Sequence, residues 1–524
     1  MARVGIDFGT TNTVVMARDR GVFSEVQHRI ETGAGTIVQS VFPSVVLIDL
    51  NTEQRWYGIE ADRRFGQRGP GRGHVFVSSL KSRLRDYVES RAEDASADPT
   101  ADVAGLLRGF LESLSESIRR SLALPDDEPI EAVITWPANA NGAQRHLTRQ
   151  CFARAGYVVL DTLNEPTASA IELADCLTAG RSGGMAAAPS AVAVFDLGGG
   201  TFDAAVVWIE GEECRVLASG GIEDLGGDNF DSLLMDMFFD AMGRSPGELD
   251  PTARIAMLRR TRAEKELISG GIVKRMHLSP RDFGLKGRAV SVEVDAFLDR
   301  VLPLLEPAVE VLRDVIEQAA TKESRLRASG PLTVYLVGGS SRLPVVAKVV
   351  SEAFSEDRVV LGDKPFRSVA MGAALCATEP VRYRDVFARH FGLIRLRDHG
   401  LAETFDPIFP AGTPIPRKGE PPLQRTVRYH PRHNVGHLRY LECTSIHPGG
   451  LPAGNVRMWS DIMFPYDPAM SLSTPSTKED VVGTGAFADE AVCEVYRCDS
   501  DGVITVELQR PARMDARTFE VYRD

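Results

Sequence analysis

The order of apolar and polar residues predicts two kinds of element along most of the chain. Short apolar runs rich in β-branched residues predict buried strands, and they lie at 3–6, 13–17, 131–136, 158–160, 191–195, 204–209 and 332–337. Between them, apolar spacing near 3.6 residues and capping signals predict helices, at 103–118, 142–156, from 164, 231–241, 251–269, 295–320, 345–354 and 369–375. Strands that alternate with helices predict an α/β fold.

Two segments of the first hundred residues fit neither pattern cleanly. The apolar run at 39–48 contains Pro43 and predicts an edge strand or the entry to a strand. Residues 66–73 are rich in glycine and predict a loop.

The pattern changes after about residue 379, where helical spacing stops and proline, glycine and short alternating segments take over. Strands are predicted at 426–429, 438–444, 491–497 and 503–509. We therefore predict an α/β domain over 1–379, with lobes of roughly 1–190 and 191–379, a linker at 380–392 and an all-β sandwich at 393–524. A chain of 524 residues is also too long for one hydrophobic core.

Composition narrows the classes of function. A hydrophobic content of 43% with 25% charged residues is ordinary for a soluble globular protein. The net charge of −12 argues against a nucleic-acid partner, and no apolar run is long enough to cross a membrane. The chain leads directly into a strand, so no signal peptide is expected. The 7 scattered cysteines fit free thiols in a reducing cytoplasm, including Cys493 and Cys498.

Two segments carry the same polar residues between strand-like runs. Residues 7–12 read Asp-Phe-Gly-Thr-Thr-Asn, and residues 196–203 read Asp-Leu-Gly-Gly-Gly-Thr-Phe-Asp. Each predicts a hairpin whose glycines let the backbone approach a ligand closely. Free backbone N–H groups in such a turn suit a phosphate. Two copies of one device predict two related halves that hold one polyphosphate from both sides.

Acidic residues of these segments indicate a bound cation, and residues elsewhere in the chain indicate phosphate or nucleotide binding. Asp196 and Asp203 would repel a phosphate unless a positive ion lies between them, and Mg²⁺ prefers oxygen ligands. Lys81 follows an apolar stretch and could reach a γ-phosphate, although a solvated helix face explains its basic neighbours equally well. Glu165 precedes Pro166 at a helix start, where it either caps the helix or faces a bound nucleotide. The glycines after the strand at 332–337 offer a nucleotide cradle.

In this order, the segments resemble the seventy-kilodalton heat-shock chaperone family within the actin-like and sugar-kinase ATPase superfamily. The resemblance covers about 3–377 and rests on 5–12, Lys81, 164–169, 196–203, 226–231, Lys265, 338–344 and 369–374. Asn-Glu-Pro-Thr at 164–167 together with 196–203 is its most specific part. The resemblance implies a duplicated, ribonuclease-H-like actin fold for the α/β domain.

The resemblance also implies a role for each matching residue. The phosphates of ATP or ADP would be held through Gly9, Thr10, Thr11, Asn12, Gly198, Gly199, Gly200, Thr201 and Gly227. Adenosine would be lined by Lys265, Ser269, Gly338, Gly339, Ser340 and Arg342. Mg²⁺, its waters and monovalent cations such as K⁺ would be organised by Asp7, Asp196 and Asp203, with Glu165. Hydrolysis would depend on Lys81, Glu165, Asp196 and Thr201, because phosphoryl transfer needs positioning and charge neutralisation.

The chain departs from the family in four places. Arg262 stands where the family usually has an acid, and Phe366 and Arg367 replace an acidic pair, so base preference is less defined than phosphate binding. The linker at 384–390 keeps only a trace of the family's leucine-rich run between aspartates. Residues 406–416 and 501–506 resemble parts of the family's substrate-binding β-domain, but the helical lid is expected to be missing after Asp524.

Two functions follow as expectations from this resemblance. The first is a slow ATPase with chaperone-like activity, whose lidless β-domain holds unfolded or extended polypeptide by strand addition and works with a co-chaperone and an exchange factor. The second is a nucleotide switch whose β-domain holds one dedicated protein partner. A small-molecule kinase and a filament-forming actin relative are weaker alternatives on fold analogy.

Overall fold

The computed structural model describes residues 2–32, 35–68, 73–84, 100, 102–179, 190–211, 213–271, 273–328, 330–397, 402–472 and 490–521. The chain divides into two compact units. The first unit comprises Met1–Asn139 and Thr148–Tyr383, and the second comprises Ala140–Leu147 and Arg384–Asp524. The boundary near residue 384 falls within the predicted linker. Within the described ranges, no helix is both long and apolar enough to cross a membrane.

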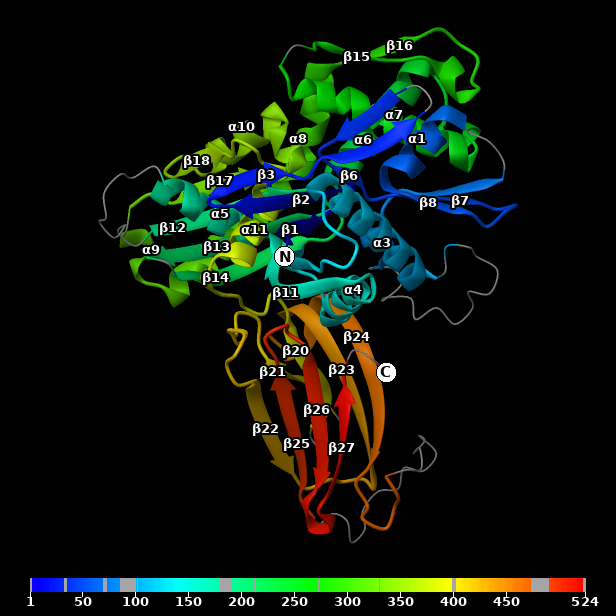
Figure 1. Cartoon of the computed structure of the whole chain (residues 1–524). Coiled ribbons are helices and arrows are strands. Elements are labelled where there is room, and N and C mark those ends of the chain that lie inside the picture. Colours follow the sequence, from blue (N-terminus) through cyan, green and yellow to red (C-terminus); the bar gives the residue numbers. More distant parts are fainter. Residues whose placement is uncertain are drawn as a thin grey trace. The chain divides into compact units, whose positions relative to one another are not determined.

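The first unit contains two large sheets with one common arrangement of strands (Figure 1). One sheet has the order β11-β10-β1-β2-β3, with β11 (Tyr157–Asn164), β10 (Ile130–Trp136), β1 (Ala2–Phe8), β2 (Asn12–Asp19) and β3 (Val22–Glu25); β6 (Phe42–Pro43) also pairs with β2. The other has the order β18-β17-β12-β13-β14-β19, with β18 (Arg358–Leu361), β17 (Thr333–Val337), β12 (Ser190–Leu197), β13 (Phe202–Glu210), β14 (Glu213–Ile222) and β19 (Arg382–Arg384).

The direction of the strands repeats as well. β1 runs antiparallel to β2 and parallel to β10, and β12 runs antiparallel to β13 and parallel to β17. Each of the two repeated sequence segments therefore forms the turn between the first two strands of its sheet. The predicted strands at 3–6, 13–17, 131–136, 191–195, 204–209 and 332–337 are confirmed, and the one at 158–160 is part of the longer β11.

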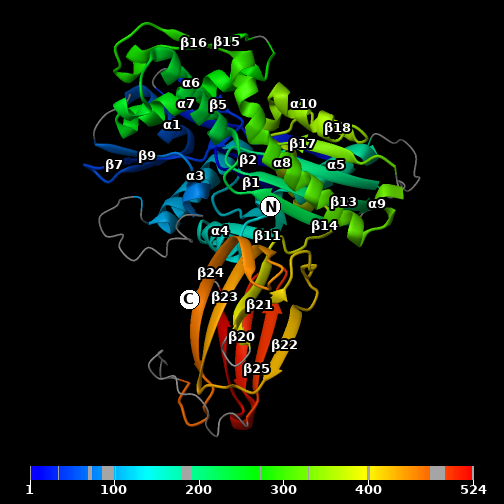
Figure 2. The same ribbon diagram turned by 180° about the vertical axis from the view of Figure 1, so that it is seen from behind.

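The described helices include all those predicted from the sequence and two that were not predicted, at 58–68 and 325–328. They are α1 (Gly58–Arg68), α3 (Val103–Leu122), α4 (Gly142–Arg154), α5 (Glu165–Ala179), α6 (Gly227–Met242), α7 (Pro251–Ile268), α8 (Val294–Lys322), α9 (Arg325–Ala328), α10 (Pro344–Ala353) and α11 (Ser368–Thr378). Asp102 caps α3 by accepting the Gly105 N–H over 2.9 Å. α8 packs on β13 and β14 (Figure 2), and its buried apolar side chains join the largest core of the unit.

Close backbone contacts fix α5 and α11 beside the first sheet. A Cβ on Gly372 of α11 would lie 1.8 Å from the Ala168 carbonyl oxygen of α5. A Cβ on Gly5 of β1 would lie 2.1 Å from the Ala374 nitrogen of α11. Glycine is required at both positions because no side chain fits there. This packing fixes α5, which begins with Glu165, against α11.

Smaller sheets complete the first unit and correct two predictions. The apolar run at 39–48 is not one strand: β5 (Gly35–Gln39) ends there, and β6 and β7 (Val46–Asp49) follow separately. The predicted glycine-rich loop at 66–73 is wrong at its start, because 66–68 complete α1, and 69–72 lie outside the described residues. β7 pairs with β8 (Arg55–Tyr57) and β9 (His74–Val77), β4 (His28–Thr32) with β5, and β15 (Arg275–Leu278) with β16 (Val290–Glu293).

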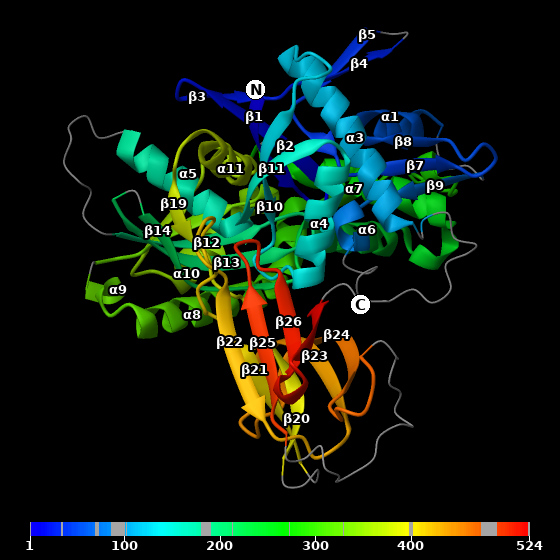
Figure 3. The ribbon, with the colours of Figure 1, turned by 60° about the horizontal axis from the view of Figure 1, so that its bottom comes forward.

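The described part of the second unit, apart from residues 140–147, consists mainly of two four-stranded antiparallel sheets (Figure 3). One has the order β21 (Ala402–Phe409), β20 (His390–Arg397), β23 (Val435–Ile446) and β24 (Pro452–Pro465). The other has the order β22 (Leu423–Tyr429), β25 (Val492–Cys498), β26 (Ile504–Arg510) and β27 (Asp515–Glu520). All four predicted strands are confirmed: β22 and β23 are longer than predicted, and β25 and β26 are shifted by one residue. The strands β20, β21, β24 and β27 were not predicted.

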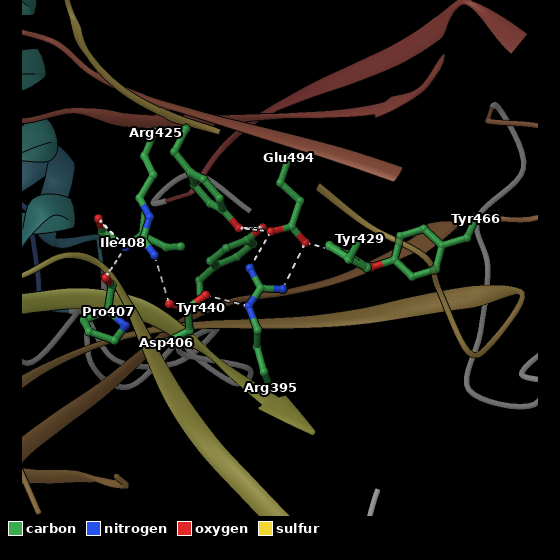
Figure 4. A network of polar contacts seen from close by, with 10 residues as sticks. Arg395, Asp406, Pro407, Ile408, Arg425, Tyr429, Tyr440, Tyr466 and Glu494 are labelled. Atoms are coloured by element: carbon green, nitrogen blue, oxygen red, sulfur yellow. Dashed lines mark hydrogen bonds and ion pairs between the residues drawn. The ribbon is translucent and has the colours of Figure 1, made fainter. Parts of the chain in front are cut away.

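A buried polar network joins the two sheets of the second unit (Figure 4). Glu494 of β25 has a side-chain exposure of 0%. Arg395 of β20 donates to Glu494 Oε2 over 2.7 Å and to Asp406 Oδ2 over 2.7 Å. The hydroxyls of Tyr496 and Tyr429 also donate to Glu494, the first over 2.6 Å. Both carboxylate oxygens of this buried acid are therefore hydrogen-bonded, as burial of a charge requires.

Further polar side chains extend the network to its edges. Arg425 donates to Asp406 Oδ1 over 3.3 Å and to the Ile408 carbonyl oxygen over 3.0 Å. The Tyr466 hydroxyl lies 2.6 Å from that of Tyr429. Burial and the neighbouring Glu494 carboxylate raise the pKa of Tyr466 above its ordinary value. The raised pKa favours the neutral hydroxyl of Tyr466, which can take part in hydrogen bonds within the network.

Candidate functional site

The turns of the two repeated segments lie against each other in the first unit. A Cβ on Gly199 would come within 2.2 Å of Thr11 Oγ1, and one on Gly200 within 2.8 Å of Thr10 Cγ2. Neither position has room for a side chain, so the backbone of the second turn packs against the threonine side chains of the first. Asp7 and Asp196, at the bases of the two turns, line one cavity of about 320 Å³.

This cavity collects nearly all of the predicted site residues. It is lined by Asp7, Gly9, Thr10, Thr11, Asn12, Lys81, Glu165, Asp196, Gly198, Gly199, Thr201, Gly227, Lys265, Ser269, Gly338, Gly339, Ser340 and Arg342. The predicted residues outside this lining are Gly200 and Asp203. Gly200 packs on Thr10, and Asp203 is buried behind the turn, where it accepts the Asn139 backbone N–H over 3.4 Å.

Hydrogen bonds from other elements hold each turn in shape. In the second turn, the Gly198 N–H donates to the Thr201 carbonyl oxygen over 3.0 Å. The N-terminus of α6 closes over it, since Asp228 N–H donates to the Gly199 carbonyl oxygen over 2.7 Å. Ser340 Oγ donates to the Gly198 carbonyl oxygen over 2.7 Å. The carbonyl oxygens are thus used by protein donors.

The first turn is supported from β6 and the residues after it. Ser44 Oγ donates to the Gly9 carbonyl oxygen over 2.8 Å, and the Ser44 N–H donates to the Thr11 carbonyl oxygen over 2.9 Å. Among the residues that the structure describes, the N–H groups of Thr10, Thr11, Gly199 and Gly200 donate to no protein atom. Such groups offer hydrogen bonds to an anion.

Acidic residues crowd the floor of the cavity around one lysine. Lys81 forms an ion pair with Glu165, the first residue of α5, and both side chains are largely buried. Burial and the Glu165 carboxylate raise the pKa of Asp7 to about 7, while Lys81 lowers it. Burial and Glu165 likewise raise the pKa of Asp203 to about 7, and burial and the neighbouring acids raise that of Asp196 well above its ordinary value. The cluster therefore contains more acidic side chains than Lys81 alone can neutralise.

The position of Lys81 decides between two interpretations of its sequence context. Lys81 lies in a helical turn at 80–84 and points to Glu165 rather than to solvent. Burial acts to lower its pKa, but Glu165 and Asp7 outweigh this and raise it, so the side chain is charged. A solvated helix face is therefore excluded, and a buried cation faces the cavity.

A metal at this floor would not be held by protein carboxylates alone. Among the described residues, no group of three or more His, Cys, Asp or Glu side chains is placed to hold a metal ion. Mg²⁺ commonly keeps several waters and binds through one or two carboxylates and substrate phosphates. The donor set therefore fits Mg²⁺ that is bound through water and phosphate oxygens, and it does not fit a carboxylate cage.

The opposite wall is formed by α7 and the start of α6. Lys265 Nζ lies 2.7 Å from Asp231 Oδ1 and donates to the Gly227 carbonyl oxygen over 2.8 Å. Arg262, the departure from the family pattern, donates to Asp231 Oδ2 over 2.8 Å and to Asp228 Oδ1 over 2.6 Å. Both cations line the cavity with their charges already paired.

The loop after β17 closes the remaining side. Gly338 has φ 84°, and a Cβ there would lie 2.3 Å from the Leu197 carbonyl oxygen and 2.5 Å from Asp196 Oδ1. Only glycine combines this backbone conformation with so close an approach. Arg342 is exposed at the edge of the cavity.

Comparison with known proteins places the chain in a family. The family model described as "Hsp70 protein" matches residues 109–386, which is more than half of the chain. The chain belongs to the Hsp70 family. Relatives named "Chaperone protein HscA homolog" are 30% identical over 383 residues in Burkholderia pseudomallei (strain 668) and in Burkholderia mallei (strain ATCC 23344), and 31% identical over 392 residues in Burkholderia cenocepacia.

These Hsp70 matches cover only part of each protein. They include 71% of this chain and 58% of each relative, so the chain spans little more than half the length of those chaperones. The family-model match ends at residue 386, close to the start of the larger segment of the second unit. Proteins of the Hsp70 family are ATPases. The family-model match includes Glu165, the second turn and the loop after β17, whereas the first turn and Lys81 precede it.

Sequence reasoning did not find several residues that shape this site. Ser44 and Asn139 support the turn and Asp203 through single hydrogen bonds, and neither belongs to a recognisable motif. Pro365 accepts the Gly338 N–H over 2.8 Å. Phe366 lines the cavity, and only its departure from the family pattern singled it out.

Proposed function

We propose that this Hsp70-family protein binds and hydrolyses ATP and that its nucleotide state controls a C-terminal β-domain that binds polypeptide. The observation that carries the proposal is the contact between two glycine turns above one cavity, with Asp7 and Asp196 on its floor. The first unit would then be an actin-like ATPase domain of two lobes, and the strands after the linker a β-sandwich.

The free N–H groups of the turns would bind the phosphates. The N–H groups of Thr10, Thr11, Gly199 and Gly200 have no acceptor within the described part of the chain. Hydrogen bonds to charged groups contribute roughly 1.5–3 kcal/mol each. The hydroxyls of Thr11 and Thr201 would add further donors. A side chain at Gly199 would remove this cradle, because it would collide with Thr11.

The acids of the floor would organise Mg²⁺ through water. Bound Mg²⁺ neutralises charge on the transferring phosphoryl group. Asp7 and Asp196 line the cavity and would accept hydrogen bonds from metal-bound water, while Asp203 would act from behind the turn. The shortage of positive charge around these acids supports a cation site.

Lys81 would act on the γ-phosphate. Its ammonium group is buried, charged and held by Glu165 at the N-terminus of α5. From there it would stabilise the γ-phosphoryl group and help to orient the attacking water, while Glu165 keeps the side chain directed into the cavity. Fixed charges of this kind cost no reorganisation during the reaction.

The adenosine would lie between α7 and the loop after β17. Lys265, Ser269, Gly339, Ser340 and Arg342 line this part of the cavity. The side chains of Arg262 and Lys265 are paired with Asp228 and Asp231, so they would act mainly as fixed walls.

An ATPase assay with and without an unfolded peptide tests this proposal. We expect slow, Mg²⁺-dependent hydrolysis whose rate changes when peptide is added. Absence of both ATP binding and hydrolysis would contradict the proposed site. If ATP is hydrolysed at a rate that no peptide alters, the ATPase activity would be supported and its coupling to polypeptide binding would be contradicted.

A dedicated protein partner is the second candidate for the β-domain. The end of the family-model match at residue 386 favours it, because the strands beyond lie outside that match. Suppression of aggregation of several unrelated proteins would support the general chaperone, and failure with all of them would favour a single partner.

A further inference from the structure

Phe366 gives the cavity a flat apolar surface. Among the described residues that line the cavity, Phe366 is the only aromatic one. Val14, Val41, Leu343, Pro365 and Val369 line the same cavity and supply further apolar wall. Phosphate groups and metal ions do not pack on an apolar surface, whereas the flat ring of a nucleobase can stack on an aromatic side chain.

The ring is held from two directions. It packs against the buried cluster of Val14, Met16, Ala370, Met371 and Ala374. The preceding residue, Pro365, is fixed by the hydrogen bond from Gly338, and Gly338 itself touches Asp196 and the second turn. The ring therefore has a defined position relative to the phosphate turns.

Arg367 occupies one face of this ring. Its guanidinium carbon lies 4.7 Å from the ring centroid of Phe366, and its Nε lies 2.6 Å from Glu25 Oε1 of β3. The ion pair keeps the guanidinium in place over the ring. Arg367 covers one face of the ring, and the half-buried ring still contributes to the lining of the cavity.

We propose that Phe366 stacks on the nucleobase and determines the preference of this site for purine over pyrimidine triphosphates. This inference rests on the proposed nucleotide site. Stacking of a base on an aromatic side chain contributes about 1–3 kcal/mol, and a purine offers the larger ring. The aromatic residue thus supplies, through stacking, base recognition at a position where the resemblance predicts an acid.

The test compares nucleotides with and without a base in the full-length protein. Dissociation constants of ATP, CTP and ribose 5′-triphosphate are measured with Mg²⁺ by competition against a fluorescent ATP analogue. Wild type, Phe366→Ala and Phe366→Leu are compared, since leucine keeps the packing on Met16 and Ala370 but cannot stack. Arg281→Ala, an exposed residue remote from the cavity lining, is the control variant.

We expect Phe366→Ala and Phe366→Leu each to weaken ATP about 5- to 20-fold, CTP less, and ribose 5′-triphosphate by less than twofold. Unchanged ATP affinity in the leucine variant, or equal loss for ATP and ribose 5′-triphosphate, would overturn the role of Phe366. If the wild-type protein binds none of the three ligands, the proposed nucleotide site is wrong. This result differs from the ones that contradict only the role of Phe366. A thermal melt of each variant shows whether it is folded.

Discussion

The protein contains two buried groups of charged side chains that are built in opposite ways. In the cavity of the first unit, Asp7, Glu165, Asp196 and Asp203 surround Lys81, and burial with mutual repulsion raises the pKa of three of these acids. In the second unit, Glu494 and Asp406 are matched by Arg395 and Arg425, and tyrosine hydroxyls satisfy the remaining oxygen positions.

The difference separates a binding site from a structural network. Buried charges are tolerated when they are paired and hydrogen-bonded, and the network around Glu494 meets this condition without a ligand. The cavity does not, since the pKa values of its acids are raised, and this is the imbalance that the proposed cation would offset. Charge balance, rather than burial or the number of acids, distinguishes the two.

The largest effect is expected from breaking the balanced network. Glu494→Ala should lower the free energy of unfolding by about 3–5 kcal/mol, because Arg395 loses one of its two carboxylate partners and two tyrosine hydroxyls lose their acceptor. Urea unfolding followed by circular dichroism measures the loss. The double variant Glu494→Leu with Arg395→Met should lose clearly less. Equal losses in both variants would mean that charge pairing is not what stabilises this network.

A comparable effect on chemistry is expected from Lys81→Ala. Hydrolysis should fall about 100-fold or more, as found when a fixed group that stabilises transition-state charge is removed, while ATP affinity stays within a few-fold. Single-turnover assays measure the first quantity and calorimetry the second. Exposed Lys286 provides the matched control as Lys286→Ala. Wild-type turnover in Lys81→Ala would remove this residue from the mechanism.

A smaller effect of opposite sign is expected for an acid of the cavity. At pH 8 and without metal or nucleotide, Asp7→Asn should stabilise the protein by roughly 1 kcal/mol, because it removes a destabilised charge. Stabilisation by MgATP should be lost. Glu494→Gln, the same change in the balanced network, should destabilise the protein. Thermal melts of both variants measure these changes. If Asp7→Asn destabilised the ligand-free protein, the claim that Asp7 carries a destabilised charge would be contradicted.

The smallest effect is a dependence of stability on pH. Burial and Glu165 raise the folded-state pKa of Asp7 and Asp203 to about 7, so folding favours their protonated forms. Their stabilising contribution is present at low pH and is lost as pH rises through about 7. Melts in EDTA should show stability declining in this window, less so in Asp7→Asn. A contribution from these groups that grows with pH would contradict the assigned direction.

Local patterns predicted most of the first unit. Uniformly apolar strands such as β12 and β13 and the strongly periodic α3 were evident from sequence, and the two glycine turns marked the phosphate end of the cavity. The run at 39–48 was misjudged because Pro43 and Ser44 interrupt it and let Ser44 support the first turn.

Features that depend on distant contacts could not be predicted. Arg395 and Glu494 are far apart in sequence, and charged residues ordinarily indicate surface, so their burial gave no signal. β21 and β27 were missed because Glu403, Asp406 and Asp515 place charges within short strands. The burial of Lys81 likewise depends on its pairing with Glu165, which only the folded chain provides.

The most direct test of the unbalanced cavity is calorimetric titration of ATP into the ligand-free protein, once with Mg²⁺ and once with EDTA. The account predicts binding at one site per chain that is at least tenfold tighter with Mg²⁺, because the cation lies between the acids and the phosphates. Equal affinity in both buffers, or tighter binding in EDTA, would contradict it.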